Sequence, residues 1–269
     1  MNVTEIRVVD CVPFENYPFK IQDNSDMEML IDSIKESGVL IPIVVRPKGK
    51  EYEILSGHRR IYACKMAGID KVPAIIRELS REEAVIFMVD SNLHREGLLP
   101  SEKGFAYKMK LEAMKHQGRA SDQLGQKLTS IQALADSSSD SKTQVQRYIR
   151  LTFLEKPLLD LVDEGRIALT PAVELSHLLP EEQRNLIETI ESEDCTPSLS
   201  QSVRMRKLSN DGLLTMDKIF EIIREYLRES KVPVPSWYMH IRGIEDKSHM
   251  FPDEESKYIW RPDTLRLLI

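Results

Sequence analysis

The chain has 269 residues, enough for two domains and a small third, and 41% of its residues are apolar. Its net charge of −6 argues against a general nucleic-acid binder, although an acidic protein can still bind DNA through one basic face. Three widely separated cysteines argue against a disulfide framework, and the lack of a membrane-length apolar run or an apolar signal core predicts a cytoplasmic protein.

The first hundred residues alternate strand-like and helix-like segments. Strands are expected at residues 5–12, 41–47, 52–57 and 71–79, and helices at residues 24–38, 58–68 and 80–96. Capping boxes are expected at the start of two helices, formed by Ser25 with Glu28 and by Ser80 with Glu83. The alternation predicts a small α/β domain over residues 1–99.

Only helical patterns follow Pro100 as far as about residue 210, which predicts an all-α domain over residues 100–210 and an α+β fold class for the chain. Residues 101–150 are its one clearly basic segment, with nine lysines and arginines against five acidic residues. A further amphipathic helix begins at Met216 in the C-terminal region, residues 211–269. Its apolar stripe suits either core packing or a dimer surface.

The turn that contains Gly57 and His58 is the first candidate site. A strand ends at Gly57 and a helix begins at about His58, so the unpaired N–H groups of the first helical turn lie beside Arg59 and Arg60. Glycine allows close approach of the backbone, and the guanidinium forks of arginine match phosphate oxygens. The turn predicts a phosphate site. In the alternative interpretation, the arginines are solvated or pair with acidic side chains of the preceding strand.

A second polar stretch lies at the end of the helix expected at residues 80–96. It contains Asp90, Ser91, Asn92 and Arg95, and the last two share a face if the helix continues. An amide oxygen can ligate magnesium, and a guanidinium can hold phosphate. The stretch therefore fits a nucleotide–magnesium site, or simply a polar helix end.

Together the two stretches resemble the ParB-type partition proteins, a DNA-clamp family that binds and hydrolyses CTP. The family motif Gly-Glu-Arg-Arg corresponds to residues 57–60, and the motif Glu-Asn-x-x-Arg corresponds to residues 91–95. "NYPFKI", "SIKESGVLIPIVVRP" and "YEILSGHRR" also look familial, and the resemblance covers roughly residues 10–210. It implies a ParB/sulfiredoxin-like domain that binds CTP and Mg, with Asn92 on the metal. The implied nucleotide-binding residues are Gly57, His58, Arg59, Arg60, Asn92 and Arg95.

The sequence departs from the family motifs in three places. His58 replaces the glutamate of the second motif, and Ser91 replaces the glutamate that supports hydrolysis in the family. The end of the first motif is unclear, because Pro18-Phe19-Lys20 stands near its place. We therefore expect CTP binding with weak CTPase activity. Asp90 would serve as the catalytic carboxylate only if its helix were turned slightly.

Residues 130–151 predict a helix-turn-helix. Ser141 is expected to cap the second helix in a capping box with Gln144, and no acidic residue lies from Ser141 to Arg150, as a DNA-facing helix requires. Ser138 and Ser139 stand where such a turn usually has an apolar residue and a glycine, so the pattern alone also fits an ordinary basic helix. The residues expected inside are Leu134, Ala135, Val145, Tyr148 and Ile149. The residues expected to bind DNA are Ser141, Lys142, Thr143, Gln144, Gln146 and Arg147.

The leading functional hypothesis is a sequence-specific DNA-binding protein of the ParB type. It would bind a palindromic site in double-stranded DNA as a homodimer, associate with the nucleoid and close into a clamp with CTP and Mg. The alternative is a helix-turn-helix regulator with a degenerate nucleotide domain and no partition role. The resemblance also implies a ParA-type ATPase partner, although the first seven residues do not look like the basic, glycine-containing peptide that contacts it.

Overall fold

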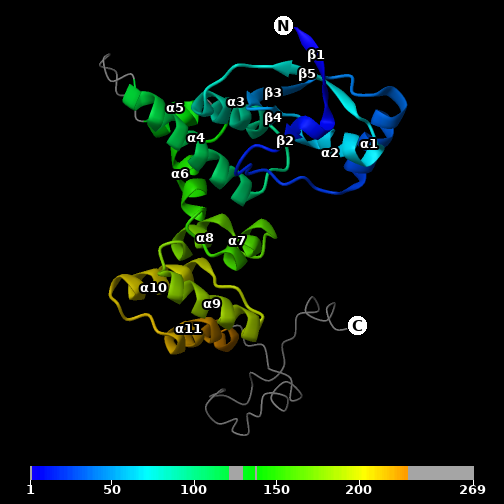
Figure 1. Cartoon of the computed structure of the whole chain (residues 1–269). Helices are drawn as coiled ribbons and strands as arrows, with labels where there is room; N and C mark the ends of the chain where they lie inside the picture. Colours follow the sequence, from blue (N-terminus) through cyan, green and yellow to red (C-terminus); the bar gives the residue numbers. More distant parts are fainter. Residues whose placement is uncertain (1, 121–129, 137, 230–269) are drawn as a thin grey trace. The chain divides into compact units, whose positions relative to one another are not determined.

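The computed structural model describes residues 2–120, 130–136 and 138–229 of the chain. These residues form two compact units, which divide between Phe153 and Leu154. The domain boundary expected at residue 99 therefore lies inside the first unit, because the helices that follow Pro100 pack against the α/β part. Figure 1 shows the elements of both units.

The first unit contains a five-stranded mixed sheet with strand order β1-β5-β3-β4-β2. Strand β1 pairs with β5 and β3 pairs with β4 in antiparallel fashion, whereas β3 pairs with β5 and β2 pairs with β4 in parallel. The single strand expected at residues 5–12 is wrong: β1 and β2 lie at opposite edges of the sheet, and the short 3-10 helix η1 separates them. The bounds are β1 Val3–Arg7, η1 Val8–Asp10, β2 Cys11–Val12, β3 Ile43–Lys48, β4 Glu51–Ser56 and β5 Lys71–Ile76.

Successive residues of β4 supply the two apolar clusters of the first unit. Ile54 belongs to a cluster with helices α1, Ser25–Ser37, and α2, His58–Ala67, whereas Leu55 belongs to a cluster with α3, Arg81–Leu93. Both side chains are almost completely buried. This alternation follows from the two-residue period of a strand, so the sheet is covered on both faces.

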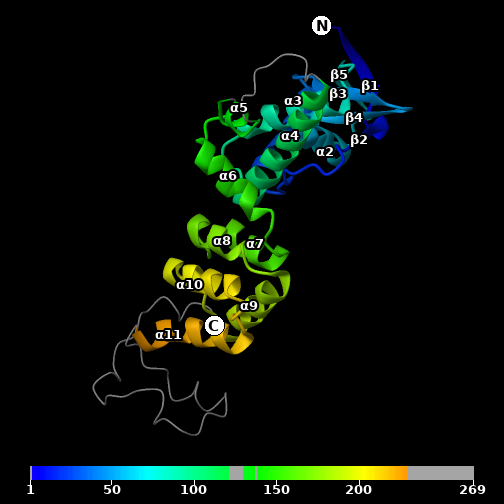
Figure 2. The ribbon, with the colours of Figure 1, turned by 90° about the vertical axis from the view of Figure 1, so that its left-hand side faces the viewer.

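Helix α4, Pro100–Ala120, packs against α3 and against α6, Lys142–Leu151. Figure 2 shows α5, Ser130–Asp136, and α6 on the side of α4 that is away from the sheet. One apolar cluster runs continuously from Phe14 to Val145 through these helices. The helix-turn-helix region is therefore built onto the α/β part.

The helix starts test the capping predictions directly. The Ser80–Glu83 capping box is confirmed, since both of its reciprocal hydrogen bonds are present. The capping box predicted for Ser25 and Glu28 is wrong, because Asn24 caps α1 and its side chain accepts from the backbone N–H of Met27. Asparagine is as good a cap as serine, and here it stands one residue earlier.

The second unit contains only helices among its described residues. Helix α11, Met216–Glu229, buries Ile219, Ile222 and Ile223, as a core-facing stripe does, whereas Met216 is exposed. The apolar side chains at residues 226 and 227 of this helix lie outside the described side chains. No helix within the described residues is long and apolar enough to cross a membrane. The bounds are α7 Lys156–Asp163, α8 Leu169–Leu175, α9 Pro180–Glu193, α10 Leu199–Asn210 and α11 Met216–Glu229.

Candidate functional site

The turn between β4 and α2 strongly favours glycine at its centre. Gly57 has φ of 107°, in the region that side chains disfavour, and a Cβ there would lie 2.6 Å from Cγ2 of Ile43. The turn therefore packs directly on β3. It delivers His58 as the first residue of α2, where backbone N–H groups have no partner within the helix.

His58 is buried and neutral near pH 7. Burial lowers its pKa to about 4, and the carboxylate of Glu53 only partly offsets this effect. Its ring stacks on that of Tyr17 at a centroid distance of 3.6 Å, and the backbone N–H of Phe14 donates to Nε2 over a long 3.5 Å. Because Nε2 accepts, the proton of the neutral ring is on Nδ1. That buried Nδ1 has no partner among the described residues.

The two arginines of the turn lie in different environments. Nε of Arg59 is buried and also has no partner within the described part of the chain. Nη1 of Arg60 donates to the carbonyls of Ile41 and Pro42, at 2.5 and 2.7 Å. Burial lowers the pKa of Arg60, against a small opposing effect of Cys64. Arg60 thus ties α2 to the loop before β3, and Arg59 is the arginine with a buried donor to offer.

Tyr17 joins the two candidate stretches. Its hydroxyl donates to Oδ1 of Asn92 at 3.3 Å, while its ring stacks on His58. Burial raises the pKa of Tyr17 to about 12, and nearby Arg95 opposes this shift, so Arg95 lies within electrostatic reach of the same hydroxyl. The structure therefore brings His58 and Asn92 together at Tyr17, with the charge of Arg95 within reach of the same hydroxyl. Tyr17 was not predicted as a site residue, although it lies within the quoted NYPFKI stretch.

The segment that carries Tyr17 is held in place by α4. Both carboxylate oxygens of the buried Glu102 accept backbone hydrogen bonds, from Lys20 at 2.6 Å and from Leu99 at 2.8 Å. A carboxylate that accepts two N–H groups forms charge-assisted bonds, which are stronger than neutral ones. From the first turn of α4, Glu102 therefore holds the segment that carries Tyr17 in place.

The end of α3 differs from its predicted form. The helix ends at Leu93, so Asn92 and Arg95 do not share a helical face, and the backbone N–H of Arg95 instead donates to the carbonyl of Asn92. Ser91 donates its hydroxyl to the carbonyl of Met88 at 2.9 Å. Asp90 forms an ion pair with the almost fully buried Lys110 of α4. The carboxylate proposed for catalysis is thus engaged with α4.

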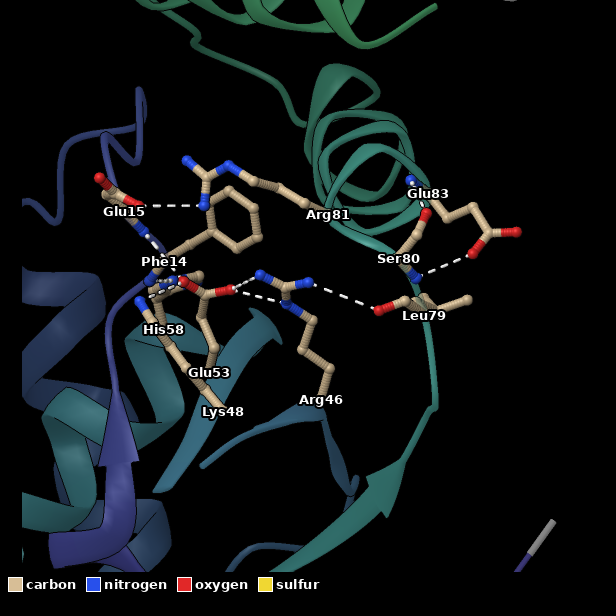
Figure 3. A network of polar contacts seen from close by, with 10 residues as sticks. All are labelled: Phe14, Glu15, Arg46, Lys48, Glu53, His58, Leu79, Ser80, Arg81 and Glu83. Carbon is tan, nitrogen blue, oxygen red and sulfur yellow. Dashed lines mark hydrogen bonds and ion pairs between the residues drawn. The ribbon is translucent and has the colours of Figure 1, made fainter. Parts of the chain in front are cut away.

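An ionic network centred on the buried Glu53 lies beside His58 (Figure 3). Glu53 has no exposed side-chain surface and pairs with Arg46 at 2.6 Å and Lys48 at 3.0 Å. Burial alone would raise the pKa of Glu53, but the hydrogen bonds and charges of Lys48 and Arg46 outweigh it and lower the pKa. Glu53 is therefore satisfied by residues of β3, and pairing with the arginines of the turn is not observed in the described residues.

The network also contacts the aromatic ring of Phe14. The guanidinium groups of Arg46 and Arg81 lie 5.9 and 5.8 Å from the centroid of Phe14, and Arg46 donates to the carbonyl of Leu79 (Figure 3). Cations over an aromatic face are attracted by its quadrupole. Phe14 in turn supplies the backbone N–H that reaches His58. Phe14 therefore links the ionic network to the candidate site.

The candidate DNA-binding helix is α6. Ser141 caps it by accepting from the backbone N–H of Gln144 at 3.2 Å; the reciprocal bond of a full capping box is not among those of the described residues. Val145 is fully buried, and Tyr148 and Ile149 are half-buried against the same cluster. On the outer face, four of the predicted DNA-binding residues are exposed and two are half-buried. The exposed ones are Ser141, Lys142, Thr143 and Gln146; the half-buried ones are Gln144 and Arg147.

Comparison with known proteins relates the chain to a family of partition proteins. Residues 1–93 match the ParB N-terminal domain. Stage 0 sporulation protein J of Bacillus subtilis is 34% identical over 167 residues, which are 62% of this chain and 55% of that protein. A probable chromosome 1-partitioning protein ParB of Deinococcus radiodurans is 34% identical over 155 residues, 58% of this chain and 49% of that protein. The chain spans about half the length of these curated relatives.

A comparison with solved structures supports the predicted fold. A solved pNOB8-like ParB N-domain matches 84% of this chain and 96% of its own chain, with a TM-score of 0.52 at 15% identity. The α+β fold predicted from the sequence, with a small α/β part followed by helices, is thus confirmed. Residues 1–93 thus carry a ParB N-terminal domain, and the chain is similar to ParB-type partition proteins over more than half of its length.

Proposed function

We propose that the chain is a ParB-type DNA-binding protein that holds CTP between the β4–α2 turn and the end of α3 and reads double-stranded DNA with α6. One observation supports the nucleotide most directly: Nδ1 of His58 and Nε of Arg59 are buried without partners among the described residues. A buried donor left unsatisfied costs about 1–3 kcal/mol. Two such donors at one helix N-terminus suit the oxygen atoms of an anionic ligand.

The remaining residues of the site fit a triphosphate with its metal. Arg59 and Arg95 would pair with phosphate oxygens, and Oδ1 of Asn92, which already accepts from Tyr17, would serve as a ligand of Mg. Mg would offset the negative charge of the phosphates. Arg60 would act mainly by holding the loop at Ile41, because its Nη1 is committed there.

Turnover is expected to be slow. The Ser91 hydroxyl donates to a backbone carbonyl and has no useful pKa near neutrality, so it cannot replace a carboxylate as a base. Asp90 pairs with Lys110, which leaves it a poor substitute. We therefore propose a protein that binds CTP and hydrolyses it weakly, with a correspondingly persistent nucleotide-bound state.

The proposal for DNA rests on α6 and on the similarity to ParB-type proteins. Its outer face carries Lys142, Thr143 and Gln146, residue types that contact phosphates and base edges. Binding as a homodimer to a palindromic site, closure into a clamp, association with the nucleoid and contact with a ParA-type ATPase are parts of the same proposal. Calorimetry with each ribonucleoside triphosphate and Mg would test the nucleotide, with and without a duplex selected from a random pool by the full chain.

Two variants sharpen this calorimetric test. Arg59→Gln should weaken CTP binding by tenfold or more, because a hydrogen bond to a charged group contributes about 1.5–3 kcal/mol. Lys65→Gln removes the same charge from an exposed position of the same helix and should leave the affinity unchanged. Absence of CTP binding by the unaltered chain under both conditions would contradict the proposal, and so would equal losses in the two variants.

A further inference from the structure

Asp140 occupies an unexpected place for an acidic residue. It directly precedes Ser141, the cap of the proposed DNA-binding helix α6, where a free carboxylate would repel phosphates. Its Oδ2 instead accepts from the hydroxyl of Tyr107 at 2.6 Å and lies 3.1 Å from Nζ of Lys103. Both partners belong to α4, and the Asp140 side chain is only 16% exposed. The carboxylate is therefore directed into the protein and neutralised there.

The partners of Asp140 are well defined. Tyr107 is almost fully buried, and burial, followed by the hydrogen bond to Asp140, raises its pKa far above neutrality, so its hydroxyl remains a donor. Nζ of Lys103 lies 5.0 Å from the ring centroid of Tyr148 as well as beside Asp140. One lysine of α4 thus contacts Asp140, two residues before α6 begins, and Tyr148 in the C-terminal half of α6.

Close backbone packing completes this contact. A Cβ on Gly104 would lie 2.6 Å from the carbonyl oxygen of Tyr148, so α4 and α6 touch at a position where no side chain fits. In the turn before α6, the hydroxyl of Ser138 accepts from the backbone N–H of Asp140 at 3.4 Å. The residues 103, 104 and 107 lie on one face of α4 and fix α6 at both its beginning and its C-terminal half.

We infer that Asp140 is a positioning residue for DNA reading: together with Lys103 and Tyr107 it sets the orientation of α6 without contacting DNA itself. This inference rests on the proposed function, since it assumes that α6 reads DNA. Discrimination between sequences depends on the placement of base-contacting side chains, whereas non-specific affinity depends mainly on the number of phosphate contacts. Loss of the Asp140 contacts should therefore lower specificity more than it lowers affinity for random DNA.

The test compares Asp140→Ala, Asp140→Asn and Tyr107→Phe in the full chain. Affinity would be measured for the selected duplex and for a random duplex over a series of salt concentrations. We expect the ratio of specific to random affinity to fall about tenfold in Asp140→Ala and less in Asp140→Asn, with the dependence on salt unchanged in all three. Glu112→Gln removes an exposed negative charge from α4 and should leave the ratio unaltered.

Three outcomes distinguish a failure of the proposed function from a failure of the positioning role. If the unaltered chain does not distinguish the selected duplex from random DNA, the proposed function fails, and this inference with it. If the unaltered chain discriminates but Asp140→Ala and Tyr107→Phe keep its ratio, the positioning role is overturned while the proposed function stands. If Asp140→Ala strengthens binding to both duplexes equally, Asp140 acts only through its charge, which also overturns positioning.

Discussion

The substitution Gly57→Ala tests how the β4–α2 turn is built. Alanine at φ of 107° incurs backbone strain of about 1–2 kcal/mol, because left-handed conformations bring Cβ close to the carbonyl oxygen. The new Cβ would also lie 2.6 Å from Cγ2 of Ile43, and forcing an extra methyl into a packed site costs about 1–3 kcal/mol. We expect the first unit to lose about 2–5 kcal/mol of its free energy of unfolding.

Gly49→Ala is the matched control for this experiment. Gly49 has φ of 65° but nothing within 4 Å of its added Cβ, so only the strain of about 1–2 kcal/mol should appear. Urea unfolding with hydrogen–deuterium exchange of peptides from residues 51–67 reports on the first unit separately from the second. Equal losses in the two variants would refute the contact with Ile43 as the reason for glycine at residue 57.

Three further predictions address acid stability, DNA reading and turnover. His58 has a folded pKa of about 4 against an ordinary 6.5, so the unfolded state binds more protons below pH 6.5. The free energy of unfolding should therefore fall by roughly 3 kcal/mol as the pH drops from 6.5 to 4. The variant His58→Gln should lose this pH dependence in unfolding titrations, and an identical dependence in the variant would exclude His58 as its cause. Gln144→Ala and Arg147→Ala should each weaken binding to the selected duplex by about 1–3 kcal/mol in gel-shift titrations. Because Gln144 carries no charge, Gln144→Ala should weaken binding to random DNA less. Equal loss of affinity for both duplexes in Gln144→Ala would argue against base reading. Ser91→Glu should raise phosphate release from CTP in the presence of the selected duplex. If the unaltered chain instead releases phosphate briskly and Asp90→Asn abolishes this release, the catalytic carboxylate is Asp90.

Much of the site's framework follows from local sequence patterns. The strand, glycine and helix around residue 57 were predicted because apolar alternation, a turn glycine and a helical stripe are all encoded within a few residues. The capping box of Ser80 with Glu83 was predicted for the same reason. Ser141 as the cap of α6 was another local pattern, and its hydrogen bond to Gln144 is present.

The individual side-chain contacts between distant segments were not predicted. Tyr17 meets Asn92 across 75 positions of sequence, and nothing in the residues around Tyr17 specifies that partner. Arg60 was expected at a phosphate because its neighbours suggested an anion site, but its Nη1 reaches backbone carbonyls 18 and 19 residues away. Likewise, Asp90 and Lys110 are paired by the packing of α3 on α4. Such pairings depend on the tertiary fold, which local periodicity does not determine.

The hold of Glu102 on Lys20 determines where the chain can be cut for recombinant work. A fragment that ends at residue 93, the limit of the family match, would lack the acceptor for the Lys20 amide. It would also uncover the apolar side chains of α3, among them Ala84, Val85, Met88 and Val89, which share a cluster with residues of α4. We expect such a fragment to aggregate. A fragment ending after Phe153 retains the whole cluster and is the sensible target for crystallisation or NMR.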